Sequence, residues 1–229
     1  MLRSTISSHP LAARFRAFVE ARDFPCVGAK SALARERMNI MGAGHLECPA
    51  DDARIHRGLV DFAAASRQDG APFQSFVVVF DAPDGLSEIE FEAALWRRLQ
   101  ALSDRDAADR LPYDPRVSSN PDEPDFSLSF GGEAYFIVGL HPGASRPGRR
   151  FDTPAIVFNP HHQFTTLRDA GRYEGLRASI IARDLAFSGS LNPMLSRHGE
   201  RSEARQYSGR ALTGAWTCPF RARGEQGKA

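Results

Sequence analysis

The chain has 229 residues, of which 42% are hydrophobic and 25% are charged, a composition that is ordinary for a globular protein. Its formal net charge of +1 excludes the strong positive field that non-specific binding to nucleic acid or to an anionic membrane needs. The sequence contains no apolar run as long as a membrane span and no signal-peptide core at its N-terminus. We therefore expect a cytoplasmic protein with no membrane or nucleic-acid partner, and the odd number of cysteines favours free thiols.

The first third of the chain predicts alternating helices and strands. Residues 11–22 have the apolar spacing of a short amphipathic helix. Pro25 ends that helix, and a second one is expected to start near Ala29. Residues 38–41 fit a short strand, and a longer helix follows over about 51–68.

The middle of the chain carries clearer signals. Residues 74–80 are β-branched, aromatic and uncharged, which predicts a buried strand. Ser87 and Glu90 form a capping box, so a helix is expected from there to about Ser103. Residues 112–125 hold several prolines and predict a long loop rather than a linker between domains.

Two further strands are expected over residues 133–140 and 155–158, followed by a helix over about 163–187. Gly171 and Gly175 interrupt or weaken that helix.

These elements predict an α+β fold: one domain over residues 1–229, with a mixed or antiparallel sheet and helices packed against it. The loop between the last two strands has no room for a crossover helix, which favours an antiparallel pairing. The tail, about 221–229, is expected to be frayed.

Histidines follow both of these strands. His141 comes directly after the first, and His161 and His162 follow the Asn-Pro dipeptide that ends the second. We expect these strand ends to be neighbours, with His161 as a candidate iron ligand, since imidazole is a common metal ligand. Because adjacent residues point in different directions, His162 is expected to support the site or face solvent.

Arginines gather between the two strands. Arg146, Arg149 and Arg150 lie in the connecting segment and could clamp carboxylates. Gln163 lies just beyond the histidine pair and is a candidate for hydrogen bonding in the same site. P-loop, nucleophile-elbow, dinucleotide-binding and zinc-motif patterns are absent from the sequence, so histidine-centred iron chemistry survives as one hypothesis.

Six phrases spread along the chain carry a family resemblance: 24–33, 141–151, 157–164, 189–195, 202–210 and 216–220. In these phrases and in their order the chain resembles the YqcI/YcgG family. This group includes the guanitoxin-biosynthesis haem-dependent N-hydroxylase and the arginine N-hydroxylase of the cycloserine pathway. The resemblance implies a haem b protein that hydroxylates a guanidine nitrogen of arginine or a related amino acid.

The resemblance also implies roles for individual residues. His161 is the first choice for the iron ligand and His141 the second choice, or a catalytic group near the iron together with Gln163. Cys218 and Cys26 also lie in family phrases and remain alternative thiolate ligands. The three arginines are expected to pair with haem propionates or with the substrate carboxylate.

The guanidine group of the substrate needs an acidic partner, for which Glu203 and Asp184 are candidates. Oxygen with an electron donor, or peroxide, would serve as the oxidant, and the partners considered include a homodimer. Two other readings stay open: a non-haem iron oxygenase with two histidines and a carboxylate such as Asp184, and a haem-binding carrier or sensor without catalysis.

Overall fold

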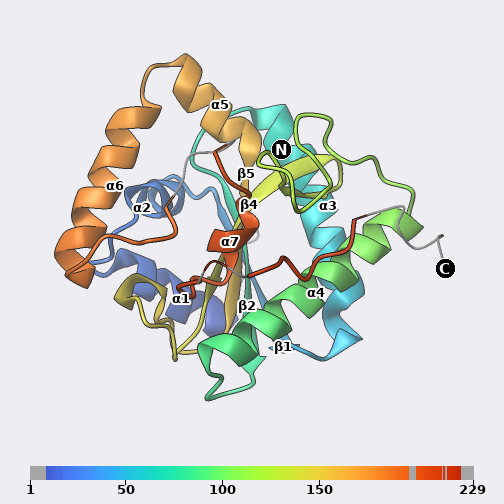
Figure 1. Ribbon diagram of the computed structural model, residues 1–229, viewed down its shortest axis with the longest axis horizontal. Helices are drawn as coiled ribbons and strands as arrows, with labels where there is room; N and C mark the ends of the chain where they lie inside the picture. The colour runs from blue at the N-terminus through green and yellow to red at the C-terminus, as the bar shows by residue number, and fades with distance from the viewer. Residues whose placement is uncertain (1–8, 196–199, 213, 215, 223–229) are drawn as a thin grey trace.

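The computed structural model describes residues 9–195, 200–212, 214 and 216–222. They form one mixed five-stranded sheet with helices on both faces (Figure 1), which confirms the expected fold class. The strand order across the sheet is β1-β2-β5-β4-β3. The strands are β1 Met38–His45, β2 Ser75–Ala82, β3 Leu128–Phe130, β4 Glu133–Leu140 and β5 Ala155–Pro160.

The sheet combines one parallel pair with three antiparallel pairs. β1 and β2 run parallel and are joined by helix α3, Asp52–Asp69. β2–β5, β5–β4 and β4–β3 are antiparallel. Of these, the β5–β4 pairing is the one that the loop between the last two predicted strands indicated. β2 lies inside the sheet with both faces covered, and this explains why its sequence is apolar without alternation.

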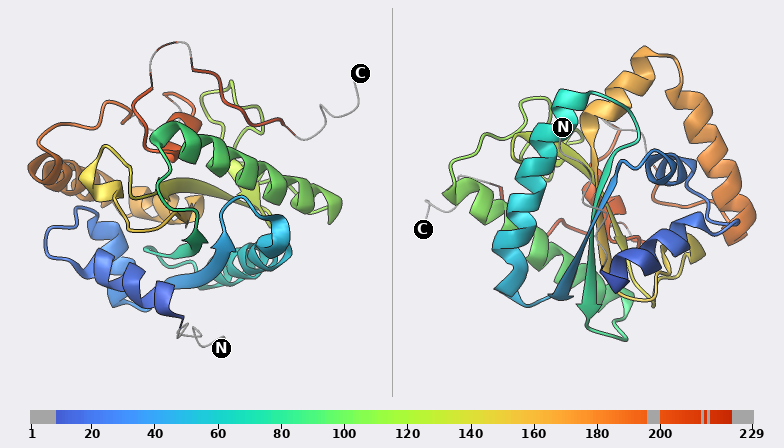
Figure 2. Two further views of the ribbon diagram at one scale, coloured as in Figure 1. Left: turned by 90° about the horizontal axis from the view of Figure 1, so that it is seen from below. Right: turned by 180° about the vertical axis from the view of Figure 1, so that it is seen from behind.

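One face of the sheet packs on α3 and on α4, Glu88–Ala108 (Figure 2, right). The predicted capping box begins α4: Ser87 and Glu90 bond each other through side chain and backbone. A large aromatic core, with Tyr135 and Phe158 among its members, fills this side of the sheet. The short helix α7, Ala204–Tyr207, contributes the buried Tyr207 to the same core.

The opposite face is covered by four helices: α1 Pro10–Glu20, α2 Val27–Ala34, α5 His161–Asp169 and α6 Tyr173–Ser188. α1 and α2 pack on the sheet through a second apolar cluster that includes Phe15 and Val77. α6 lies outside α2 at the rim of the molecule in both Figure 1 and Figure 2.

The structure differs from the sequence expectations in a few elements. The helix expected over 163–187 is two helices, and the chain turns at Gly171, whose φ of +65° suits glycine. Gly175, in contrast, lies within α6. β3 and α7 were not predicted, and residues 223–229 of the expected frayed tail lie outside the described part of the chain. None of the helices described is long and apolar enough to span a membrane.

Candidate functional site

The histidines lie at opposite ends of the β4–β5 hairpin. The register pairs Leu140, the neighbour of His141, with the first residue of β5, and pairs Pro160, the neighbour of His161, with Tyr135. At ~3.4 Å per residue, the two ends of this pairing are roughly 17 Å apart. The prediction that neighbouring strand ends bring these histidines together is therefore wrong, because the end of one antiparallel strand faces the start of the other.

His141 is buried on the α4 face of the sheet. Its ring stacks on Phe91 with a centroid distance of 4.3 Å and an interplanar angle of 17°. Burial lowers the pKa of His141, so the neutral ring is favoured. Within the described residues, Nδ1 has no hydrogen-bond partner. This environment is that of a core histidine.

His161 and His162 begin α5 and are engaged by carboxylates. The His161 Nε2 lies 3.0 Å from Glu203 Oε2 and 3.1 Å from the hydroxyl of Ser127. The Nδ1 of His162 lies 3.1 Å from Oε1 of the buried Glu133. His161 and Glu203 thus come together as predicted site residues, but they form a hydrogen-bonded cluster that ties α7 to the end of the sheet.

A cavity of about 310 Å³ lies between the sheet and helices α1, α2 and α6. Its walls are mostly apolar, with a few polar side chains among them, as is usual for ligand and cofactor sites of ~300–1,000 Å³. Five of the residues singled out from the sequence line it: Cys26, Arg146, Arg149, Gln163 and Asp184. These residues come from four separate parts of the chain, so the cavity is the candidate functional site.

The sheet presents partly exposed apolar side chains to this cavity. Phe136 and Val138 of β4 and Val157 of β5 line it and are only partly buried. On the opposite face of the same strands, Ile137 and Phe158 are fully buried. No residue of α6, which is described throughout, is fully buried. The cavity floor and the helix above it therefore offer apolar surface to a ligand.

Cys26 enters the cavity at the start of α2. Its Sγ accepts a hydrogen bond from the backbone N–H of Ala29 at 3.4 Å, in the position of a helix N-cap. Burial raises the pKa of the Cys26 thiol, while the backbone N–H groups of Ala29 and Gly28 and the charge of Arg149 oppose that rise. The neutral thiol is therefore favoured in the absence of a metal, and a metal bound there would have to replace the thiol proton.

Arg149 forms part of the cavity wall, and its guanidinium donates hydrogen bonds to backbone carbonyls. Its guanidinium donates to the carbonyls of Gly139, Tyr207 and Gln206, each at 3.0 Å. Burial lowers the pKa of Arg149 to about 10, although the nearby carboxylate of Asp184 opposes this. The side chain remains a cation at neutral pH, and it connects α7 to the cavity.

Arg146 and Asp184 form an ion pair at the rim of the cavity. The Arg146 Nη2 lies 2.5 Å from Asp184 Oδ2 and also donates to the carbonyl of Ser190. The hydroxyl of Ser188 donates to the other carboxylate oxygen at 3.1 Å. Both charged side chains are largely buried, with 11% and 18% of their surface exposed.

Two other predicted residues have structural contacts. Both ends of the Gln163 amide bond the backbone of Gln74, which joins α5 to the start of β2. Arg150 is exposed and donates to the carbonyls of Ala144 and Ser145 within its own loop, outside the cavity lining. The prediction that three arginines share one site is wrong for Arg150.

Cys218 lies on the other side of the sheet from this cavity, where it packs against the core beside α4. It lines an open surface groove with Asp122 and Trp216, and burial raises the pKa of its thiol to about 12. The described part of the chain contains no group of three or more His, Cys, Asp or Glu that could hold a metal ion. The two-histidine, one-carboxylate arrangement is therefore not assembled there.

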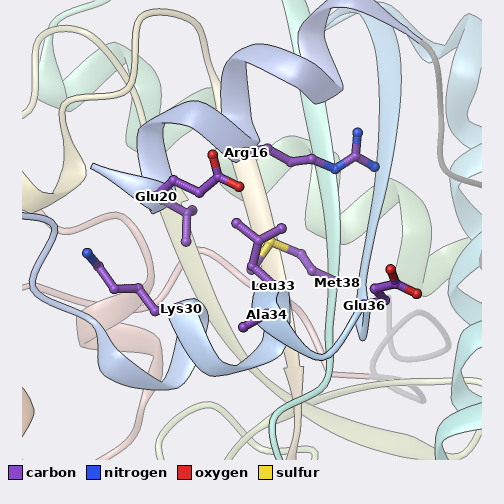
Figure 3. A pocket seen from close by; sticks show the side chains of 8 residues that line it. Arg16, Glu20, Lys30, Leu33, Ala34, Glu36 and Met38 are labelled. Carbon is purple, nitrogen blue, oxygen red and sulfur yellow. The ribbon is translucent and has the colours of Figure 1, made fainter. Parts of the chain in front are cut away.

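A second hollow lies between α1 and α2, next to the start of β1 (Figure 3). Arg16, Glu20 and Lys30 line it, together with the apolar side chains of Leu33 and Met38. Met38 and Val19 line both this open groove and the cavity, so they form a thin wall between the two. The groove carries mixed charges and none of the residues singled out from the sequence.

Sequence reasoning missed the cavity floor. Phe136, Val138 and Val157 alternate with core residues along their strands, which signals only that the sheet is covered on both faces. Leu176 and Ile180 are spaced four residues apart on α6, and this apolar stripe was the available signal for a helix facing the cavity.

The comparisons place the chain among known proteins. The model of the YqcI/YcgG family matches residues 15–221. The Bacillus subtilis (strain 168) proteins YcgG and YqcI, both named as uncharacterized, are 30% and 28% identical to it. These matches cover 82% and 80% of this chain, and 76% and 74% of the relatives. No solved structure matches it significantly. The chain belongs to the YqcI/YcgG family.

Proposed function

We propose that the protein binds haem b in the Cys26 cavity and uses it to hydroxylate a guanidine nitrogen of arginine or a related amino acid. The observation that supports this proposal most is the cavity itself. It combines apolar walls, a thiol at a helix start and buried arginines beside a carboxylate. The resemblance noted from the sequence points to the same chemistry.

The donor set of the cavity fits haem better than the histidines do. Cys26 lines the cavity, whereas the Nε2 of His161 faces Ser127 and Glu203 in another cluster. We therefore favour Cys26 over His161, His141 and Cys218 as the iron ligand. The apolar floor suits the face of a porphyrin, and Arg149 supplies a cation for its propionates or for the substrate carboxylate.

Haem can bind in this cavity only if the cavity becomes larger. A volume of about 310 Å³ is small for a tetrapyrrole. Leu176, Ile180 and Ile181 of α6 line the cavity without being fully buried. We therefore expect α6 to lie farther from the sheet when haem is bound.

Haem would supply the redox chemistry that activates oxygen or peroxide. The net reaction replaces one guanidine N–H by N–OH. With O₂, a donor provides two electrons and two protons and one water forms; with hydrogen peroxide, one water is released. The chain's residues hold the thiolate in place through Ala29, orient the charged substrate, and exclude water with the apolar side chains of α6 and the sheet.

The test is reconstitution of the full chain with haem, followed by reaction with arginine. We expect a stoichiometric Soret band, a change in that band on adding arginine, and N-hydroxyarginine by mass spectrometry when peroxide or O₂ with a reductant is supplied. A protein that stays colourless overturns the proposal. Bound haem without product from arginine or other guanidino amino acids supports the carrier or sensor reading, and iron without porphyrin supports the non-haem reading.

A further inference from the structure

The Arg146–Asp184 ion pair lies at a junction between two hollows. Arg146 lines the Cys26 cavity and also a smaller surface hollow of about 190 Å³, bordered by Pro147, Ser190 and Gly209. Asn192 likewise lines both. The guanidinium of Arg146 is therefore placed where the cavity meets the outside of the molecule.

The pair is formed by a guanidinium end-on to a carboxylate. Arg146 meets Asp184 through one nitrogen and one oxygen, Nη2 and Oδ2, and the same Nη2 also serves the carbonyl of Ser190. A guanidinium that approaches a carboxylate side-on makes two parallel hydrogen bonds and is held more strongly. A free guanidine-bearing molecule in the cavity can therefore compete with Arg146 for Asp184.

Asp184 is also near the group that would hold iron. Its charge acts on the Cys26 thiol and on Arg149, and all three line the same cavity. The neighbouring Arg183 donates to the carbonyls of Phe24 and Pro25, which anchors this part of α6 to the segment before Cys26. In this structure these contacts hold the carboxylate close to the thiol.

We propose that Asp184 is the guanidinium-binding residue of the cavity and that Arg146 is an internal placeholder, which a guanidine-bearing ligand displaces into the adjoining surface hollow. This inference depends on the proposed function for the identity of the ligand as a guanidino amino acid. It also predicts that Arg146 competes with the guanidino ligand for Asp184 and thereby reduces the apparent affinity of the site for that ligand.

The test is calorimetric titration of arginine into the full chain, as purified and after haem loading. We expect Arg146→Gln to bind arginine at least tenfold more tightly than the wild type, because Asp184 is then free of its internal partner. Asp184→Asn should lose measurable binding. Arg150→Gln is the matched control, since Arg150 bonds only its own loop and lies outside the cavity lining; its affinity should be that of the wild type.

If the Arg146–Asp184 ion pair has only a structural role, removing Arg146 should not make arginine bind more tightly. Unchanged or weaker arginine binding by Arg146→Gln would overturn the inference. Should this variant be too unstable for calorimetry but still show a thermal transition, thermal denaturation with millimolar guanidinium chloride, against equal sodium chloride, decides. A rise in Tm for Arg146→Gln but not for Arg150→Gln supports the placeholder, and no rise refutes it. Because the haem-free chain is measured separately, a colourless protein that binds arginine this way rejects the proposed function alone.

Discussion

Enlarging side chains on the cavity floor should stabilise the protein. Val138 and Val157 are direct partners across β4 and β5, and both are only partly buried against the cavity. Replacing both with isoleucine adds two methylene groups to apolar surroundings without lowering strand propensity. At ~0.8 kcal/mol per buried methylene, the free energy of unfolding should rise by about 1.6 kcal/mol. For a domain of this size, that corresponds to a Tm increase of roughly 3–6 °C.

The same row of the sheet supplies the control. Val77 on β2 pairs with Val157 and faces the same side, but it is fully buried. Val77→Ile must overpack the core and should lower the free energy of unfolding by about 1–3 kcal/mol. Urea denaturation of both variants measures the two effects. If the double variant is destabilised as much as Val77→Ile, the floor is already packed and the reasoning about the cavity is refuted.

Three further predictions concern residues around the sheet. Because the folded state depresses the pKa of His141, the unfolded chain binds more protons than the folded chain below pH ~6.5. The free energy of unfolding should therefore decrease by up to about 1.4 kcal/mol for each unit by which the pH is lowered. Denaturant titrations from pH 7 to 5 should show a smaller pH dependence for His141→Phe. Gly139→Ala should destabilise by about 1–3 kcal/mol, since a Cβ there meets the Phe91 ring at 2.7 Å; equal denaturation midpoints would contradict this. Arg149→Met leaves three carbonyls without their donor and should cost about 3–5 kcal/mol, with faster hydrogen exchange in α7 as the second readout.

Elements with strong local signals could be predicted from the sequence. The capping box at Ser87 located the start of α4, and the apolar runs located β2 and β4. β3 and α7 have three and four residues, too few for a periodic pattern, and depend on pairing and packing with distant segments.

The site was predictable only in part. The sequence singled out Cys26, Arg149 and Asp184, but a lone cysteine carries less local signal than paired histidines, so the histidines were ranked first. The predicted histidine site does not form, because an antiparallel hairpin places His141 and His161 at opposite ends of the paired strands. The cavity arises from packing between segments more than a hundred residues apart, which no local pattern contains.

The most direct test of the central claim is the ligand of the haem iron. In Cys26→Ser the hydroxyl can still cap α2, so the fold is kept, while Cys26→Ala should cost about 1 kcal/mol of stability through the lost cap. We predict that wild-type protein and Cys218→Ser, reconstituted with haem and reduced under carbon monoxide, show the red-shifted Soret band of a thiolate-bound iron, and that both Cys26 variants lose it. An unchanged spectrum in Cys26→Ser would contradict the account.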